Sequence, residues 1–361
     1  MTSKFPVLLA AFLCCNILSK AQTDTQQTQN SNVHIGLVYP LSTNGFRAAT
    51  YTNLFSAHAL IGVSKNERAF CAAGFGNIVK DSAKGLVAAG FFNVIGHGAS
   101  GMQAAGFINC IGGKATGMQA AGFTNITDSA TGAQFAGFVN VNRHNIDGFQ
   151  AAGFINTAKK VNTQIAGFVN VADSVSGSQV AGFINVAGKV KGVQIAGFIN
   201  VADSSDYPIG LINIIKKGQK AIGITIDETG TTLAAFRSGG KVLYGIVGAG
   251  FNFNYNSNLF AMQAGLGAHL PLSKYITLSG ELSVTSLTDF WWGSYMNSAI
   301  RIMPSIKIRK VEAFAGPSIN YANTTHGVGT GIINNTLWHE QIFPRTHDLH
   351  IGFLAGVQYH L

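Results

Sequence analysis

The sequence is dominated by a short repeat that runs from Ala72 to Asn213. The triplet Ala-Gly-Phe recurs nine times at a spacing of about 15 residues, and an asparagine stands three residues after each of its glycines. From the third copy on, a glutamine also stands three residues before the glycine. A fixed period of this kind indicates a repeat architecture. The repeat positions that we single out are Gln103, Phe107, Asn109, Gln119, Phe123, Asn125, Gln179, Phe183, Asn185, Gln194, Phe198 and Asn200.

The composition of the repeat favours strands over helices. Two glycines in each copy would cost a helix roughly 1 kcal/mol each relative to alanine, and no residue of the repeat is placed to cap a helix. Read as one strand, the copy from Val190 to Val201 sets Gln194, Phe198 and Asn200 on one face and aliphatic residues on the other. Neither face is charged beyond Lys191, so we expect protein or lipid to cover both.

Two strand geometries fit the period, which leaves about eight residues for a strand and about seven for a return. In a parallel solenoid, equivalent residues stack at roughly 4.8 Å, which gives a phenylalanine stack flanked by ladders of bonded asparagine and glutamine amides. In an antiparallel meander, the returns should alternate between two types. The returns at 128–131, 173–176 and 188–191 are instead uniform, and this favours the solenoid.

The repeated glutamine, phenylalanine and asparagine have a structural and a functional interpretation. The structural one is that buried amides need hydrogen-bond partners, which a ladder of identical residues supplies. The functional one is a periodic binding face for a glycan or a peptide, which would require aromatic rings and amides that are exposed together. Because each phenylalanine is flanked by alanine, we expect the rings to be buried and favour the structural interpretation.

The N-terminal residues resemble an export signal. Residues 1–21 combine Lys4, an apolar run from Val7 to Leu13 and the sequence Ser19-Lys20-Ala21, as in a cleavable secretory signal peptide. In the following segment, 22–69, we expect a polar start and then strands near 33–42 and 54–63. These strands are expected to pair with each other or to cover the first coil of the repeat region, 70–215.

Two cysteines remain after the signal, Cys71 and Cys110. Their positions in the repeat frame differ by about seven residues, which separates them by on the order of 20 Å on equivalent strands. This distance is too long for a disulfide, so we expect two free, buried thiols.

Charge is sparse along the chain. The formal net charge is +9, but charged residues make up only 11% of the sequence. The adjacent lysine pairs, Lys159-Lys160 and Lys216-Lys217, have no aromatic residues interleaved with them, so the sequence argues against nucleic-acid binding. Attraction to anionic lipid or glycan remains as the partner chemistry that this charge suits.

From residue 216 to 361 the pattern changes to longer alternating strands. Between Tyr275 and Leu287, for example, aliphatic residues alternate with polar ones. Segments of about ten residues with this alternation are typical of a transmembrane β-barrel, although a soluble sandwich produces the same pattern with its faces exchanged. Eight strands are expected, which is enough to close a small barrel: 220–226, 231–237, 241–253, 258–270, 274–287, 297–308, 311–321 and 349–361.

Two features favour the barrel. The polar faces carry charges that can pair across a small lumen, with Lys307 expected to meet Glu312 across the turn at 309–310; these candidate lumen charges are Glu281, Arg301, Lys307 and Glu312. Aromatic residues gather at strand ends, at 290–292 with Tyr295 and at Trp338, as in a membrane-interface belt. The final residue is Leu361, where outer-membrane barrels usually have phenylalanine.

No catalytic, cofactor or metal site is predicted. The segment between Tyr321 and His347 is the richest in histidine, but His339-Glu340 lacks the second histidine of a zinc helix, and Pro344 interrupts the segment. The repeated glycines do not form a nucleotide fingerprint, because no helix follows them. The sequence therefore predicts that the chain is not an enzyme.

The recurring motif Gly-x-Gln-x-Ala-Gly-Phe-x-Asn, followed by the segments 207–213 and 236–244, resembles a bacterial family of surface-repeat proteins. Members of that family carry similar copies ahead of a glycine-rich β tail, and the resemblance spans roughly residues 33–361. It implies export to the outer membrane or cell surface of a bacterium with two membranes. It carries over no catalytic residue.

The sequence thus predicts an all-β chain, with a repetitive β region in which a solenoid is favoured over a meander, and a C-terminal barrel-like antiparallel domain at 216–361. The expected function is that of a non-enzymatic outer-membrane or cell-surface protein, structural or adhesive, with the repeats as scaffold. The segments 288–296 and 322–347 are expected to be contact sites, and the expected partners are outer-membrane lipid and a surface glycan or host protein. The alternative is an outer-membrane channel or small-solute pore.

Overall fold

The chain folds almost entirely into β-strands. The computed structural model describes residues 28–253, 259–290, 293–325, 332–333 and 336–361. The predicted signal peptide at 1–21 lies outside the described residues. Two units can be distinguished, Met1–Ala181 and Gly182–Leu361, and each is described by itself.

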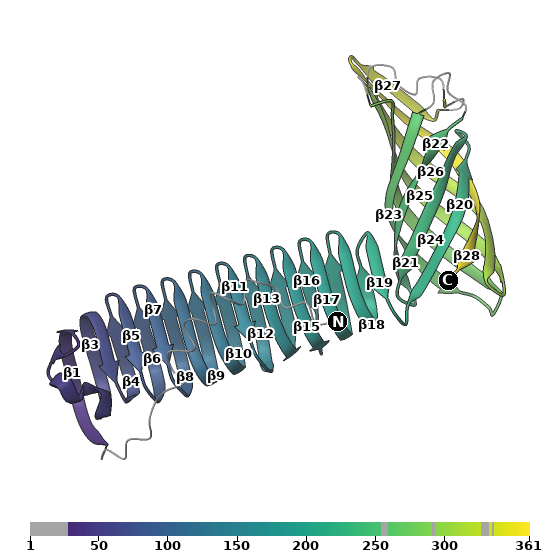
Figure 1. Cartoon of the computed structure of the whole chain (residues 1–361). Helices are drawn as coiled ribbons and strands as arrows, with labels where there is room; N and C mark the ends of the chain where they lie inside the picture. The colour runs from purple at the N-terminus through teal and green to yellow at the C-terminus, as the bar shows by residue number, and fades with distance from the viewer. Residues whose placement is uncertain (1–27, 254–258, 291–292, 326–331, 334–335) are drawn as a thin grey trace. The chain divides into compact units, whose positions relative to one another are not determined.

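The first unit contains parallel strands that follow one another in successive coils (Figure 1). Its elements are β1 (Gln29–Val38), β2 (Leu41–Ser42), the 3-10 helix η1 (Gly45–Thr50), β3 (Tyr51–Ser64), β4 (Asn66–Ala73), β5 (Gly76–Val79), β6 (Ser82–Ala89), β7 (Phe92–Ile95), β8 (Gly98–Ala105), β9 (Ile108–Ala121), β10 (Thr124–Ala136), β11 (Val139–Asn142), β12 (Ile146–Ala152), β13 (Ile155–Val161), β14 (Thr163–Ala166), β15 (Val169–Val175) and β16 (Gln179–Ala181).

The second unit contains further coils of the repeat and an antiparallel sheet. The coils are formed by β17 (Ile184–Ala196), β18 (Ile199–Ile209) and β19 (Ile212–Ile215). The antiparallel strands are β20 (Gln219–Asp227), β21 (Thr231–Gly239), β22 (Leu243–Asn252), β23 (Leu259–Pro271), β24 (Ile276–Thr288), β25 (Ser294–Ile308), β26 (Val311–Thr325), β27 (Trp338–Ile342) and β28 (Arg345–His360).

The repeat region is a parallel β-solenoid of about eleven turns, so the solenoid prediction is confirmed and the meander is excluded. Identical residues of neighbouring coils lie in register. Gln103 of β8 pairs with Gln119 of β9, and Asn93 of β7 pairs with Asn109 of β9. The amide ladder therefore follows directly from the sequence period.

Some copies contain two short strands, such as β7 and β8, and others a single long one, such as β9, so the prediction of one strand of about eight residues and a return of about seven was wrong. In the copy from Val190 to Val201, β17 ends at Ala196 and β18 begins at Ile199. The supposed return at 128–131 lies inside β10, and 188–191 lies inside β17. The corner at Gly-Phe separates the strands, because coils approach so closely there that only glycine fits: a Cβ on Gly106 would lie 2.0 Å from the carbonyl oxygen of Gly90.

The interior of the solenoid is bonded through side-chain amides. Asn93 Nδ2 donates to Asn109 Oδ1 at 2.9 Å and to the carbonyl oxygen of Ala104 at 2.8 Å. Gln119 Nε2 donates to Gln103 Oε1 at 3.1 Å. These asparagine and glutamine side chains are fully buried, so each coil is held to the next by hydrogen bonds that no water competes for.

The phenylalanines form a stacked ladder on the outside of the coils. In the first unit, neighbouring rings from Phe75 to Phe168 stack with centroids 4.7 to 5.1 Å apart. The expectation that they are buried was wrong, since Phe107 is 38% exposed and Phe123 is 39% exposed. Strand alternation restarts at the Gly-Phe corner, so glutamine and asparagine both point inward while the ring between them points outward.

The N-terminal strands cover the first coil with a buried polar cluster. β1 and β3 pair in parallel, and β3 continues into pairings with β4 and β5. His34 Nε2 lies 3.4 Å from His58 Nε2, Asn53 donates to Glu67, and Ser56 donates to both carboxylate oxygens of Glu67. Burial lowers the pKa of His34 to about 4, with a further contribution from His58, and burial raises the pKa of Glu67.

Cys71 and Cys110 are buried thiols that take part in no disulfide, as predicted. Within the described residues, no helix has the length and apolar character needed to cross a membrane.

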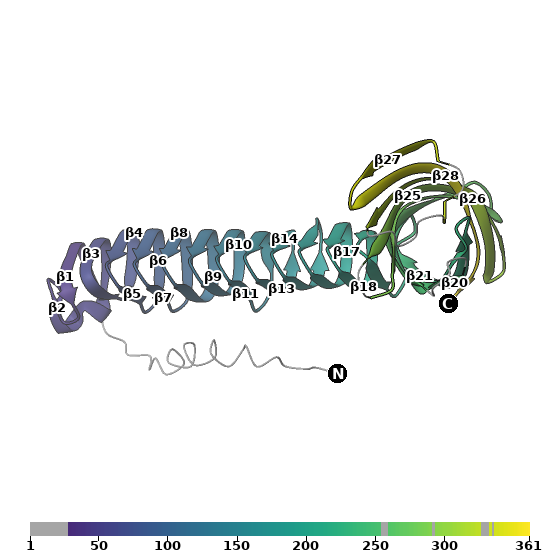
Figure 2. The ribbon, with the colours of Figure 1, turned by 90° about the horizontal axis from the view of Figure 1, so that it is seen from above.

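The second unit contains a closed antiparallel barrel of eight strands, which confirms the predicted fold class. Strands β20 to β26 pair in chain order, β26 pairs with β28, and β28 closes the ring against β20 (Figure 2). The eight predicted strands correspond to β20 to β26 and β28. The short β27, which extends β28 as a hairpin, was not predicted.

The ladder predicts that a smaller buried side chain contributes more stability than a larger exposed one. Asn125→Ala removes donation to Asn140 Oδ1 and to the carbonyl oxygen of Phe135, and leaves both acceptors buried. We expect a loss of about 2 to 4 kcal/mol in the free energy of opening of β9 and β10. Phe123→Ala should cost only about 1 to 2 kcal/mol, because the ring is partly exposed. Hydrogen exchange of the amides in β9 and β10 measures both, and the reverse order would contradict the ladder.

The N-terminal cluster predicts acid sensitivity of β1 and β3. The pKa of His34 is 6.5 in the unfolded chain and about 4 in the folded chain, so protonation of His34 favours the unfolded chain. The free energy of unfolding is therefore highest above pH 6.5 and falls by on the order of 3 kcal/mol as the pH decreases towards about 4. Glu67 has the opposite effect on the free energy of unfolding, because its raised pKa makes the folded chain bind a proton more readily and so stabilises it most at acid pH. Exchange protection of β1 and β3 should therefore fall between pH 6.5 and 4.5, with β9 as internal reference. His34→Gln should flatten this dependence, and an unchanged dependence would rule out His34 as its source.

Candidate functional site

The outer wall of the barrel is apolar. Along β25, the exposed side chains include Ile300, Ile302 and Ile306, while the alternating residues Arg301 and Ser305 are buried in the interior. Strand β24 repeats the pattern, with exposed leucine and valine alternating with buried serine, threonine and glutamate. This polarity is the reverse of that of a soluble sandwich and is the arrangement found in barrels that face lipid.

The interior of the barrel is filled by a bonded cluster of charged and polar groups. Arg237 Nε donates to Glu281 Oε1 at 2.8 Å, and the Tyr244 hydroxyl donates to the same oxygen at 2.9 Å. The Arg237 guanidinium also lies 4.8 Å from the centre of the Phe314 ring. Arg237 and Glu281 are almost completely buried, and each neutralises the other's charge in the absence of water.

The space left beside this cluster is too small for a solute. A cavity of about 10 Å³ remains among Arg237, Tyr244, Glu281, Glu312 and Phe314. This is close to the lower limit for holding a single water molecule. An eight-stranded barrel has an interior just wide enough for side chains, and here the side chains occupy it.

The structure places three of the four candidate lumen charges in the interior: Glu281, Arg301 and Glu312 are buried. Lys307 is half-buried near the end of β25. Arg237, which pairs with Glu281, was not predicted, although it continues the inward alternation of Thr231, Leu233 and Ala235.

The predicted pairing of Lys307 with Glu312 is not formed among the described residues. The two residues face each other in register, but the Glu312 carboxylate accepts hydrogen bonds from Ser305 and Gln358 and contacts His360. The carboxylate thus lies among inward donors, whereas the lysine is close enough to the strand end for its ammonium to reach water.

A half-buried carboxylate, that of Glu228, joins strands at the other end of the barrel. Glu228 contacts His350 Nε2 at 3.0 Å and accepts from Asn320 Nδ2 at 3.1 Å and from the backbone amide of Phe353 at 2.9 Å. These partners come from β26 and β28, so Glu228 holds the turn after β20 against the closing strands.

The two ends of the barrel differ in the length of their connections. One end carries the connections 240–242, 272–275 and 309–310, together with Leu361, whose amide donates to the carbonyl oxygen of Lys220. At the other end lie the turn 228–230 and the strand ends between which the chain is longer, namely Asn252 and Leu259, Thr288 and Ser294, and Thr325 and Trp338. The last coil of the repeat ends with β19, and the chain then enters the barrel through β20 at the end with the short connections (Figure 1).

The predicted aromatic belt is only partly present. Tyr295 is buried against Leu259 and Leu287 inside the barrel, so its assignment to a belt was wrong, because the strand alternation turns it inward. Phe290 and Trp338 are exposed, and residues 291–292 lie outside the described residues.

The histidines of the segment 322–347 do not assemble a metal site within the part of the chain that the structure describes. His339 Nδ1 contacts Asp348 Oδ1 at 2.6 Å across the β27–β28 hairpin, and Tyr321 contacts His347. His326 lies outside the described residues.

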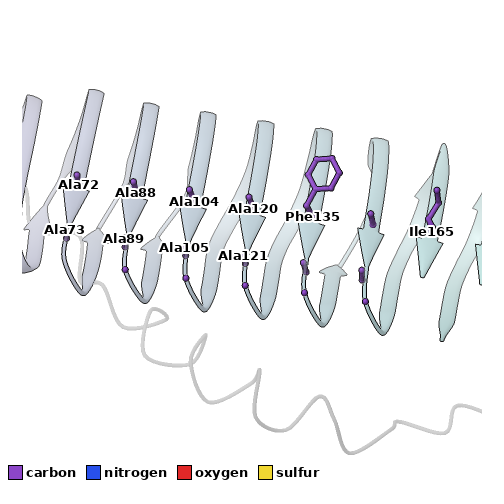
Figure 3. A pocket seen from close by; sticks show the side chains of 18 residues that line it. Ala72, Ala73, Ala88, Ala89, Ala104, Ala105, Ala120, Ala121, Phe135 and Ile165 are labelled. Atoms are coloured by element: carbon purple, nitrogen blue, oxygen red, sulfur yellow. The ribbon is translucent and has the colours of Figure 1, made fainter. Parts of the chain in front are cut away.

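A shallow apolar groove of about 700 Å³ follows the outer face of the solenoid in the first unit. Its floor consists of paired alanines from successive coils, such as Ala104 and Ala105, and larger side chains, Phe135 and Ile165, narrow it (Figure 3). The alanine pairs of its floor, such as Ala104 and Ala105, belong to the parallel ladders, so their side of the groove is almost entirely apolar.

Comparison of the chain with protein-family models, with curated proteins and with solved structures gives no match. The resemblance to surface-repeat proteins stays a prediction. The polarity, the filling and the charge of the barrel are therefore the features that bear on function.

Proposed function

We propose that the chain is a non-enzymatic outer-membrane protein, in which the barrel is a lipid-embedded anchor and the solenoid is a structural scaffold. The observation that carries the proposal is the inverted polarity of the barrel. Exposed isoleucine, leucine and valine form its outer wall, while Arg237, Glu281, Arg301 and Glu312 are buried within it.

In water, this outer wall would be a large contiguous apolar surface, which soluble monomers rarely expose. In a bilayer the same wall is matched by hydrocarbon, and closure of the β20–β28 pair leaves no unpaired edge in the described ring of β20 to β26 and β28. The exposed Ile300 and Ile302 on β25 and Leu282 on β24 then contact acyl chains.

The filled interior favours an anchor over the alternative, a small-solute pore. The Arg237–Glu281 pair crosses the lumen, Tyr244 and Phe314 pack beside it, and the remaining cavity is about 10 Å³. A solute could pass only if this cluster came apart, which would leave buried charges without partners.

The connections suggest how the chain is oriented. Outer-membrane barrels place short turns in the periplasm and long loops outside the cell. Because β20 begins at the end with the short connections, the solenoid that precedes it is assigned to the periplasm. The described residues of the predicted contact segments 288–296 and 322–347 belong to the opposite end and would face a glycan or host protein outside.

The anchor is tested by electrophoresis of the outer-membrane fraction in mild detergent. The unboiled chain should migrate faster than the boiled chain, because a closed barrel resists unfolding in detergent. As a matched comparison, Ile300→Lys on the lipid-facing wall should reduce the fast band, since lysine near the middle of a bilayer costs about 2 to 4 kcal/mol. A soluble chain without a heat-dependent shift would contradict the proposal and indicate a sandwich core.

The orientation is tested by labelling single introduced cysteines on intact cells with a membrane-impermeant maleimide. Glu340→Cys, on the exposed β27, should react, while Lys160→Cys, exposed on the solenoid, should react only after the outer membrane is permeabilised. The native Cys71 and Cys110 are buried and give little background. If Lys160→Cys were labelled on intact cells, the proposed orientation would be wrong and the solenoid would be assigned to the cell surface.

A further inference from the structure

Most of the basic residues between 216 and 361 lie at the end of the barrel that has the short connections. We call this set the basic girdle: Lys216, Lys217, Lys220, Lys241, Lys274, Lys307, Arg309 and Lys310. The opposite end is acidic instead, with Asp227, Glu228, Asp289, Glu340 and Asp348 beside Arg345. Charge is thus separated along the barrel axis, although the chain as a whole is sparsely charged.

Two members of the basic girdle lie over exposed tyrosine rings. The Lys274 ammonium is 5.6 Å from the centre of the Tyr275 ring, and the Lys310 ammonium is 5.5 Å from that of Tyr359. Both tyrosines are about half exposed. Tyrosine with lysine at a strand end is the composition of a membrane interface, where the ring lies at headgroup depth and the ammonium reaches the polar side.

A pocket opens within the basic girdle, between the coil of β18 and β19 and the connection 240–242. Its volume is about 380 Å³, and Lys217, Lys241, Ser204, Ser205 and Tyr207 line it together with Asp206 and apolar residues. Ser205 is 92% buried, being 8% exposed, and its hydroxyl has no hydrogen-bond partner. Two lysines and a serine whose hydroxyl has no hydrogen-bond partner therefore line the same pocket. Asp206 is the acidic residue among the lining residues.

We infer that the basic girdle binds the phosphate groups of anionic phospholipids, and that this pocket holds one of them. The inference rests on the proposed membrane anchor and adds the headgroup class and the leaflet, which is the one on the side of the short connections. The donor set suits a phosphate, since lysine ammonium and serine hydroxyl groups donate and a phosphate only accepts.

The occupant is a lipid and not a free phosphate because the basic girdle borders the apolar wall. Leu272, Ile308 and Val311 are exposed at the same end of the barrel as Lys274, Arg309 and Lys310. A phospholipid satisfies both surfaces at once, with acyl chains on the wall and its headgroup on the lysines. Basic residues at a membrane surface each strengthen attraction to anionic lipid by about 1 kcal/mol, which is about fivefold.

The test uses the full chain reconstituted into nanodiscs that contain phosphatidylcholine and phosphatidylglycerol, with native mass spectrometry to count the lipids that stay bound. The wild-type chain should retain phosphatidylglycerol in preference to phosphatidylcholine, and added salt should weaken the preference. The variant Lys217→Gln/Lys241→Gln should lose about fivefold for each lysine removed. Its heat-dependent electrophoretic shift should stay that of the wild type, which shows that the barrel is folded.

The matched control is Lys159→Gln/Lys160→Gln, which removes the same charge from exposed positions of the solenoid and should leave lipid retention unchanged. Equal losses in both variants would overturn the inference in favour of a net-charge effect, and so would full retention by Lys217→Gln/Lys241→Gln. Displacement of phosphatidylglycerol by equimolar inorganic phosphate would assign the pocket to free phosphate instead. A chain that neither inserts nor shows the heat-dependent shift refutes the membrane anchor itself, whereas insertion without lipid preference refutes only this inference.

Discussion

The structure depends on one constraint, which is that polar side chains buried inside it need hydrogen-bond partners, and the chain itself supplies most of these partners. In the solenoid, the partner of each asparagine amide is the same asparagine one coil away, as in the bond from Asn109 to Asn125. A shift of register would leave such amides buried and unbonded, at a cost of about 1 to 3 kcal/mol each. The ladder therefore sets the register of each coil relative to the last, and the phenylalanine ladder outside follows it.

The barrel meets the same constraint by other means. Its interior is also polar, but the bonds there join different residue types from distant strands, such as Arg237 of β21 with Glu281 of β24 and Glu228 with His350 of β28. These pairs form only when the sheet closes on itself. Closure thus removes the sheet edges and satisfies the buried charges in one step.

Both architectures consequently bury polar side chains, which lie beside aliphatic ones in the solenoid, and both leave hydrocarbon on their surfaces. For the barrel, the outer wall, the filled lumen and the basic girdle are consistent with a single role, that of an anchor held in hydrocarbon and stabilised by phosphate groups at one end. For the solenoid, the half-exposed phenylalanines and the alanine-floored groove show that an outer surface can be apolar while the core is bonded through amides. The scaffold is then stiffened along its length by ladders that solvent does not reach.

The sequence alone determined those features of the structure that depend on a regular spacing of residues along the chain. Recurrence of Gln, Phe and Asn at a constant spacing predicts a repeat architecture and favours stacked coils over a meander, and alternation from Tyr275 to Leu287 predicts a strand with one apolar and one polar face. Burial of Glu281, Arg301 and Glu312 follows from the same alternation.

Only the tertiary structure decided which side chains face inward after the Gly-Phe corner of the solenoid and which side chains meet when the barrel closes. The Gly-Phe corner reverses the side on which Phe107 lies, because coils that approach to within backbone contact at Gly106 must turn there, and alternation begins again after the turn. The partner of Glu281 is Arg237 and not a nearer residue, because barrel closure, and not distance along the chain, determines which inward side chains meet. For the same reason, lysines scattered between 216 and 310 become a girdle only when the strand ends that carry them are brought to one end of the barrel.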